Sequence, residues 1–150
     1  MKLYLDASAL NRPFDDQSLP QNRVEAESVV VILEMVEQGK VELISSSVLV
    51  YENLMNPFIY RREYVASYLS MASVFVATNA ALLERAREIE QRGIAALDAL
   101  HLASAEQAEA EWFITCDDRI LRRRRRGRLP VAFNVSTPVE FVAERRIIDG

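Results

Sequence analysis

Short apolar runs alternate with longer helical patterns along the 150 residues of this chain, and this alternation most constrains its fold. The runs that we expect to form strands are residues 2–5, 41–44, 73–77, 112–115 and 131–135. The helical patterns cover residues 23–38, 61–69, 80–91, 96–108 and 118–124. Short strands that alternate with helices are typical of an α/β fold whose sheet is mainly parallel. At this length we expect one such domain, covering residues 1–150.

Capping and turn residues mark where several helices begin or end. Gly39 and Gly93 follow helical patterns and are good stop signals. The serines at 45–47 offer N-caps for a further helix, which the proline at position 57 must end. Thr137 is expected to cap a last helix that opens with a first-turn proline. Residues 15–22 are polar and contain a proline, so we expect a loop there.

Composition narrows the classes of protein to which the chain can belong. Half of its residues are hydrophobic and 27% are charged, which suits a soluble domain with a substantial core. No apolar run approaches the roughly 20 residues of a membrane helix, and the N-terminus lacks the pattern of a signal peptide. The single Cys116 excludes an intrachain disulfide and favours a reducing cytoplasm. One histidine and one cysteine cannot supply a zinc site of the usual kind.

Four carboxylates from distant segments sit against apolar residues. Asp6 and Asp117 each follow a predicted strand, while Glu52 lies in the first turns of a predicted helix. Asp98 interrupts the apolar pattern IAALDALHLASA. Parallel sheets bind ligands at the carboxyl ends of their strands, so we expect these side chains at one edge of the sheet. Charged groups are rarely buried unless they are paired or bind metal, so the set predicts an oxygen-liganded Mg²⁺ or Mn²⁺ site.

Each carboxylate also has an ordinary structural interpretation. Asp6 could form an Asx-turn or cap a helix, and Glu52 could be a solvated helix residue. Asp98 could be a first-turn aspartate that the helix dipole stabilises, but that effect of about 0.3–1 kcal/mol does not explain the burial of a lone carboxylate. Of the adjacent pair after the fourth strand, we assign Asp117 to the site and Asp118 to the cap of the next helix.

Three polar neighbours of these carboxylates are candidates for supporting roles. Ser8 could hold a metal-bound water or cap a helix, and Thr115 could hydrogen-bond a neighbouring carboxylate. His101, the one histidine, could orient Asp98 or contact phosphate, although an ordinary packed histidine is our default interpretation.

The strongest local charge feature is the run of arginines at residues 122–126. The formal net charge of −4 argues against a generally basic nucleic-acid-binding surface, but not against a local patch. A solvated helix end is one interpretation, because cations complement a helix C-terminus. Contact with phosphate is the other, and the position of the run just after Asp117 favours it. We therefore expect substrate contacts from Arg122, Arg123 and Arg124.

The motifs LDASAL, SSSVLVYENL, ALDALHLASA and FITCDDRIL, in this order, resemble those of PIN-domain ribonucleases, notably the VapC-type toxins of prokaryotic toxin–antitoxin systems. The resemblance spans nearly the whole chain. It implies a three-layer α/β/α fold with a five-stranded parallel sheet, a Mg²⁺ or Mn²⁺ site, cleavage of single-stranded RNA, frequent homodimers and often an antitoxin partner. The family's metal-binding and catalytic positions correspond to Asp6, Glu52, Asp98 and Asp117. Asn11 is a further candidate near the site, whereas Asp118 and the arginine run receive no family role.

The residues and the resemblance together predict a cytoplasmic, metal-dependent endoribonuclease that hydrolyses single-stranded RNA, the toxin of a toxin–antitoxin pair. Glu52 is expected to be either a metal ligand or the base that orients a water. The alternative is a non-catalytic PIN-fold module that binds nucleic acid or protein. A phosphoacceptor receiver domain is disfavoured, because SVFVATNAAL offers no aspartate after the third strand and VAFNVSTPVEF offers no lysine after the fifth.

Overall fold

The computed structural model describes the backbone of residues 1–149 and the side chains of residues 1–145. Five strands form one sheet in the order β3-β2-β1-β4-β5, and every pairing between them is parallel. The strands are β1 (Lys2–Leu5), β2 (Glu42–Ser46), β3 (Val74–Val76), β4 (Trp112–Ile114) and β5 (Asn134–Ser136). The predicted α/β fold with a five-stranded parallel sheet is therefore confirmed.

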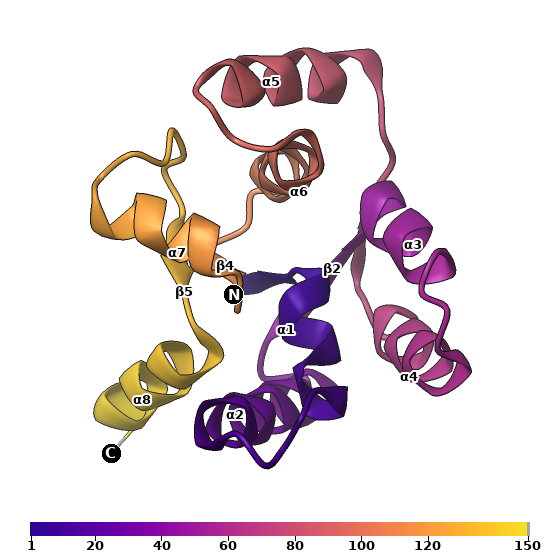
Figure 1. The fold of residues 1–150 in the computed structure, drawn as a ribbon, viewed down its shortest axis with the longest axis vertical. Helices are drawn as coiled ribbons and strands as arrows, with labels where there is room; N and C mark the ends of the chain where they lie inside the picture. Colours follow the sequence, from indigo (N-terminus) through magenta and orange to yellow (C-terminus); the bar gives the residue numbers. More distant parts are fainter. Residues whose placement is uncertain (150) are drawn as a thin grey trace.

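Helices cover both faces of this sheet. They are α1 (Ala7–Asn11), α2 (Pro20–Glu37), α3 (Ser47–Leu54), α4 (Ile59–Leu69), α5 (Ala80–Gln91), α6 (Ala96–Gln107), α7 (Asp118–Arg125) and α8 (Pro138–Asp149), with a 3₁₀ turn, η1 (Arg12–Phe14), after α1. The pair α5 and α6 lies on one side of the sheet, while α2 and α8 pack together on the other (Figure 1). No helix within residues 1–149 is long and apolar enough to cross a membrane.

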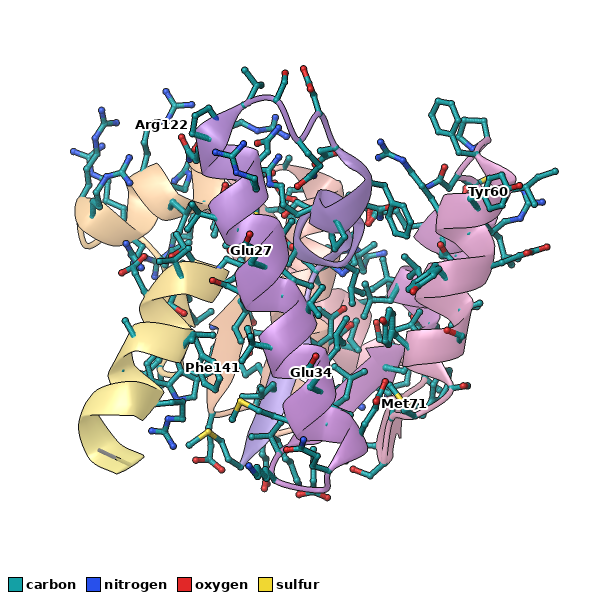
Figure 2. The ribbon with its side chains drawn as sticks, turned by 90° about the horizontal axis from the view of Figure 1, so that it is seen from below. Glu27, Glu34, Tyr60, Met71, Arg122 and Phe141 are labelled. Carbon is teal, nitrogen blue, oxygen red and sulfur yellow. The ribbon has the colours of Figure 1, made fainter. Side chains whose placement is uncertain are left out.

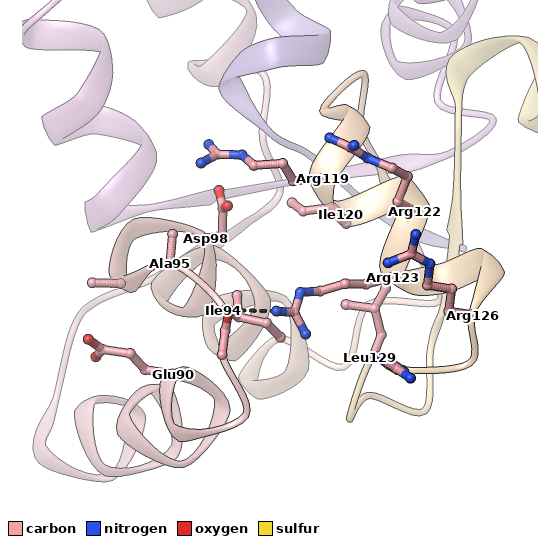
Figure 3. Close-up of a pocket in the computed structure, with 13 residues that line it drawn as sticks. Glu90, Ile94, Ala95, Asp98, Arg119, Ile120, Arg122, Arg123, Arg126 and Leu129 are labelled. Carbon is pink, nitrogen blue, oxygen red and sulfur yellow. Dashed lines mark hydrogen bonds between the residues drawn. The ribbon is translucent and has the colours of Figure 1, made fainter.

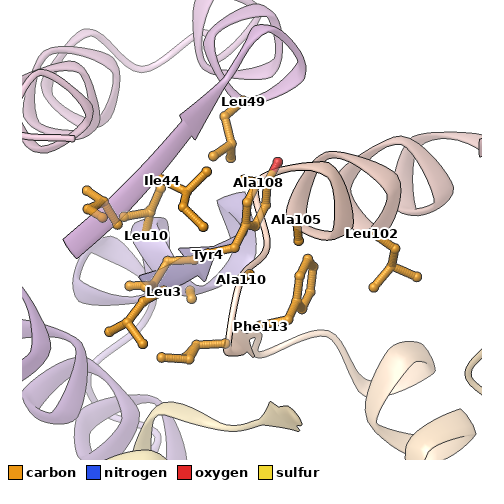
Figure 4. Packing of buried hydrophobic residues seen from close by; sticks show 14 of the residues in the cluster. Leu3, Tyr4, Leu10, Ile44, Leu49, Leu102, Ala105, Ala108, Ala110 and Phe113 are labelled. Carbon is orange, nitrogen blue, oxygen red and sulfur yellow. The ribbon is translucent and has the colours of Figure 1, made fainter. Parts of the chain in front are cut away.

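The core is built around the central strand β1, which is apolar on both faces because helices cover both sides of a parallel sheet. Leu3, Tyr4 and Leu5 have no exposed surface. The ring of Tyr4 stacks on that of Phe113 in β4, with centroids 5.3 Å apart, and Leu102 of α6 lies close by (Figure 4). This packing holds the carboxyl ends of β1 and β4 side by side.

Several helix boundaries match the local sequence signals. Gly39 and Gly93 have φ angles of +72° and +91°, the left-handed conformation that glycine adopts at little cost. The Ser46 hydroxyl accepts a hydrogen bond from the Leu49 amide and caps α3. Thr137 Oγ1 accepts from the amide nitrogen three residues later, and that residue's carboxylate accepts from the Thr137 amide, so α8 begins with a capping box.

Other boundaries differ from the prediction. The expected loop at 15–22 is wrong in its last part, because Pro20 serves as a first-turn proline and opens α2. The fifth strand covers 134–136 and not 131–135, since its ladder follows the three residues of β4, with Asn134 opposite Trp112. Neither α1 nor η1 was predicted. Tyr60, near the start of α4, and Arg122 of α7 lie toward the same end of the molecule (Figure 2).

Candidate active site

Asp6 lies directly after β1 and is only 5% exposed. Its Oδ1 accepts hydrogen bonds from Ser8 Oγ at 2.6 Å and from the Ala9 amide at 3.0 Å, so it caps α1. Its Oδ2 accepts from Thr115 Oγ1 at 2.5 Å. Burial raises the pKa of Asp6, while these donors and the nearby His101 oppose the rise. The capping interpretation of this aspartate is therefore confirmed, and the carboxylate is also tied to the end of β4.

Two hydroxyl groups join the loops that follow β1 and β4. Ser8 Oγ accepts a hydrogen bond from the Cys116 amide at 3.0 Å and lies 3.2 Å from Thr115 Oγ1. Thr115 Oγ1 in turn accepts from the Asp117 amide at 2.9 Å. The prediction that Thr115 binds a neighbouring carboxylate is confirmed. Ser8 contacts Asp6 instead of capping α1 itself.

The prediction that Asp118 caps the helix after β4 is wrong, whereas the assignment of Asp117 to the site stays a prediction. Asp117 has an extended backbone and its Oδ1 accepts from the Arg119 amide at 2.8 Å, so it caps α7. Asp118 is already the first helical residue, where it can only complement the helix dipole. The cap must have a non-helical backbone, and the helix starts one residue too early for Asp118 to provide it. The Arg119 Nε lies 3.8 Å from the same Asp117 oxygen.

Asp98 lies in the first turn of α6, half-buried at the sheet edge. No side chain or amide among residues 1–145 donates a hydrogen bond to its carboxylate. Burial raises the pKa of Asp98, and the negative charges of Asp117 and Glu52 raise it further, against the opposing effect of Arg119. A bound cation would relieve this repulsion on Asp98.

Glu52, on α3, is held by the buried His101, whose Nε2 lies 2.8 Å from Glu52 Oε1. His101 Nδ1 is 2.7 Å from the Tyr4 hydroxyl, which is 2.8 Å from Ser46 Oγ. The default prediction of a packed histidine is confirmed, but its hydrogen-bond partner is Glu52 and not Asp98. Tyr4 and Ser46 were not singled out, because a tyrosine inside an apolar run is typical of core and a serine before a helix is typical of a cap.

The four predicted carboxylates do not form a closed metal cage. Among the residues whose side chains are described, no three His, Cys, Asp or Glu groups are close enough to hold an ion together. Their donor atoms are nevertheless all carboxylate oxygens, the type that Mg²⁺ and Mn²⁺ prefer. The assignment of Asp6, Glu52, Asp98 and Asp117 as metal ligands stays a prediction.

A cavity of about 590 Å³ opens beside Asp98, between the α5–α6 turn and α7 (Figure 3). Arg122 and Arg123 line it, and Arg123 Nη2 donates to the Gly93 carbonyl at 2.6 Å. Arg124 points elsewhere: its Nη1 donates to the Val135 carbonyl at 2.8 Å and pairs with a carboxylate of α8 at 3.1 Å. Of the three arginines predicted to bind substrate, Arg124 thus has an evident structural role.

Asn11 lies away from this cavity and links two local segments. Its Nδ2 donates to the Ala7 carbonyl at 2.9 Å, and its Oδ1 accepts from Asn56 at 3.2 Å. It lines a separate cavity of about 400 Å³, which Glu52 also lines.

The fold and this edge define a class: a parallel α/β domain with acidic side chains at the carboxyl ends of its strands. The chain belongs to the PIN domain family, whose model matches residues 3–126. PIN domains are generally nucleases. The resemblance inferred from the four motifs is therefore confirmed. A search of curated protein sequences finds no match.

Solved structures share the fold at low sequence identity. FitAcB from Neisseria gonorrhoeae is 20% identical, with a TM-score of 0.55 over 91% of this chain and 97% of that one. VapBC2 from Rickettsia felis, solved bound to a DNA fragment from its promoter, is 14% identical, with a TM-score of 0.58 over 91% and 98%. A protein from Pyrobaculum aerophilum is 17% identical, with a TM-score of 0.51 over 99% of both chains.

Proposed function

We propose that this protein is a divalent-metal-dependent endoribonuclease that cleaves single-stranded RNA as the toxin of a toxin–antitoxin pair. The observation that carries the proposal is the position of Asp98, whose side chain lines one cavity together with five arginines. Burial and then repulsion by Asp117 and Glu52 raise the pKa of Asp98, in agreement with this position. Carboxylates that repel one another beside a basic cavity suit a cation and a phosphodiester together.

Asp6, Asp98 and Asp117 would hold the metal, with Glu52 as a fourth ligand or as the base. A bound Mg²⁺ or Mn²⁺ would supply Lewis-acid activation of water and neutralise charge on the scissile phosphate. Glu52 has its Oε1 occupied by His101, and no described residue donates to its Oε2. That second oxygen is the natural acceptor for a proton of the attacking water.

The hydrogen bonds that hold the Asp6 carboxylate also fix its position for binding a cation. Its carboxylate receives hydrogen bonds from Ser8, Ala9 and Thr115, so the carboxylate cannot rotate away from the sheet edge. Such hydrogen bonds favour the charged form and partly offset the burial that raises its pKa. Asp6 is thus preorganised, as a group that binds a cation must be.

An antitoxin partner is supported by a second surface. Toxin–antitoxin proteins are among the structural relatives, and large apolar side chains are exposed along the end of α3 and the start of α4. They are Leu54, Met55, Phe58, Ile59 and Tyr60. Several exposed large apolar side chains within one short segment are typical of a site for another protein. The homodimer stays a prediction that size measurement in solution would test.

The test is cleavage of a labelled single-stranded RNA by the purified chain with Mn²⁺, with Mg²⁺ and with EDTA. We expect cleavage with metal, none with EDTA, and none by Asp98→Asn with metal. Arg87→Gln, a change on the exposed face of α5, is the matched control and is expected to cleave normally. Single-stranded DNA and duplex RNA in parallel reactions define the substrate. Stabilisation by Mn²⁺ without any cleavage would favour the non-catalytic binding module.

A further inference from the structure

We infer that two adjoining arginine-lined cavities bind consecutive phosphates of a single nucleic-acid strand as it leaves the acidic edge at Asp98. This inference rests on the proposed function for the identity of the strand. The first cavity, of about 590 Å³, is lined by five arginines: Arg119, Arg122, Arg123, Arg126 and Arg128. The second, of about 430 Å³, adds Arg92 and shares two of the five, Arg123 and Arg128. Together they form a continuous basic track, which is unexpected in a chain of net charge −4.

Two hydrogen bonds hold the guanidinium of Arg123 within this track. Its Nη2 and Nη1 donate to the carbonyls of Gly93 and Arg92, at 2.6 Å and 3.3 Å. A guanidinium has five N–H donors, so these two bonds leave donors free for a ligand. Glycine at position 93 leaves room for this contact. Its φ is +91°, and a Cβ on this residue would lie only 3.0 Å from Arg123 Nη2. The α5–α6 turn and α7 thus hold one guanidinium at the centre of the track.

The positive charge of the track is largely unneutralised. Only two carboxylates, Glu90 and Asp98, line the first cavity beside its five arginines. Arg119 has one distant contact with Asp117, at 3.8 Å. Among the described side chains, Arg122, Arg123, Arg126 and Arg128 form no ion pair with a carboxylate. A ligand with several negative charges is what such a surface binds.

The arginines of this run lie on different sides of α7 and have different neighbours. Arg122, Arg123 and Arg126 face the first cavity, whereas Arg124 is neutralised by Glu140 of α8. Arg125 is exposed and lines neither cavity. The helix turns adjacent arginines to different sides, so Arg125 offers a control within the same helix.

A nucleic-acid strand fits this track better than an acidic protein segment. Asp98 lines the first cavity, so an anion bound there lies beside the carboxylates that would meet the scissile phosphate (Figure 3). A strand brings its phosphates at regular intervals, one at the acidic edge and the next beside the arginines. Because the contacts reach phosphates and not bases, they position the strand without reading its sequence.

The test is fluorescence anisotropy of a labelled single-stranded RNA, measured in EDTA so that no cleavage occurs. The double variant Arg126→Gln/Arg128→Gln is compared with Arg125→Gln/Arg87→Gln, which removes the same charge outside the track. We expect the track variant to lose on the order of tenfold in affinity, and its slope of log K against log salt to fall by about 1.4, as for two lost phosphate contacts of a single strand. The control pair should change less than about twofold, and both should melt like the wild type, since all four side chains are exposed.

Equal losses in the two variants would overturn the inference, as would a wild type that binds neither RNA nor single-stranded DNA in EDTA. Loss of a co-purified protein partner by the track variant, with RNA affinity unchanged, would overturn it in favour of an acidic protein segment. If strands bind through the track and RNA is never cleaved, the inference stands and the proposed function fails. If RNA is cleaved equally by both variants and the affinities match, the proposed function stands and the inference fails.

Discussion

His101 Nε2 lies 2.8 Å from Glu52 Oε1, although the two residues are 49 positions apart in the chain. A carboxylate only accepts hydrogen bonds, so this contact assigns the proton to Nε2. Nδ1 can then accept the proton of the Tyr4 hydroxyl, and Tyr4 can accept from Ser46. Burial raises the pKa of Tyr4, so the hydroxyl keeps its proton. This chain of hydrogen bonds joins β1, α3 and α6 behind the glutamate.

Tyr4→Phe should destabilise the protein and loosen Glu52. The substitution keeps the ring that stacks on Phe113 but leaves His101 Nδ1 and Ser46 Oγ without their shared partner. We expect a loss of about 1–3 kcal/mol in the free energy of unfolding, measured in urea. The ¹⁵N shift of His101 Nδ1 should also change, because that nitrogen loses its donor while Nε2–H stays on Glu52.

Tyr60→Phe is the matched control, because that side chain is 84% exposed. It should change neither stability nor the histidine shifts. If Tyr4→Phe leaves the Nδ1 shift of His101 unchanged, then the Tyr4 hydroxyl does not donate to that nitrogen.

Asp98→Asn should stabilise the metal-free protein at neutral pH. Burial, then repulsion from Asp117 and Glu52, raises the pKa of Asp98 above its usual 3.8. A raised pKa means that the folded state holds the proton more tightly than the unfolded chain does. The stabilisation from this group is therefore complete below about pH 3.8 and is lost as the pH rises through the raised pKa. The neutral amide of the variant does not undergo this loss. We therefore expect the Tm of Asp98→Asn in EDTA to be about 2 °C above that of the wild type at pH 7.

The comparison must be made across pH. The advantage of Asp98→Asn should be small near pH 4 and grow toward neutrality in thermal melts. A constant difference at all pH values would show that ionisation of Asp98 is not its cause.

Mn²⁺ should stabilise the wild type and not the variants that lose a ligand. Binding to the folded state alone adds about 2.7 kcal/mol when the ion is at 100 times its Kd, which is several degrees in Tm. Asp98→Asn and Asp117→Asn should show much smaller shifts, and EDTA should reverse the shift in the wild type. Ca²⁺ serves as a comparison, because it takes more oxygen ligands at longer distances. Equal Mn²⁺ shifts in the wild type and both variants would place the ion elsewhere.

Thr115→Val should destabilise the sheet edge, because it removes a hydroxyl and keeps the shape of the side chain. The change deprives Asp6 Oδ2 of its donor and the Asp117 amide of its acceptor. We expect a loss of about 1–3 kcal/mol in the free energy of unfolding and a further rise in the pKa of Asp6. Thr78→Val, at an exposed position, is the control and should have little effect. Unfolding in urea and a titration of Asp6 by NMR would check both parts.

Local patterns explain what could be predicted of the site. Asp6 and Asp117 follow apolar runs, and strands end where such runs end, so their place at the sheet edge could be inferred. That Asp117 and not Asp118 caps α7 could not be inferred, because two adjacent aspartates have the same capping preference. Which one caps depends on where the backbone turns from extended to helical, and residue 117 is the last extended one.

The sequence by itself determined the alternation of strands and helices, the parallel sheet and the carboxylates at strand ends, because these follow from apolar periodicity and from residues close in the chain. Only the tertiary structure decided which partner each side chain meets. Glu52 binds His101, while Arg123 lies on the Gly93 turn and Arg124 pairs with α8. These contacts join segments that are distant in sequence. The sequence also does not distinguish neighbouring arginines of one run, because the packing of α7 decides to which side each one points.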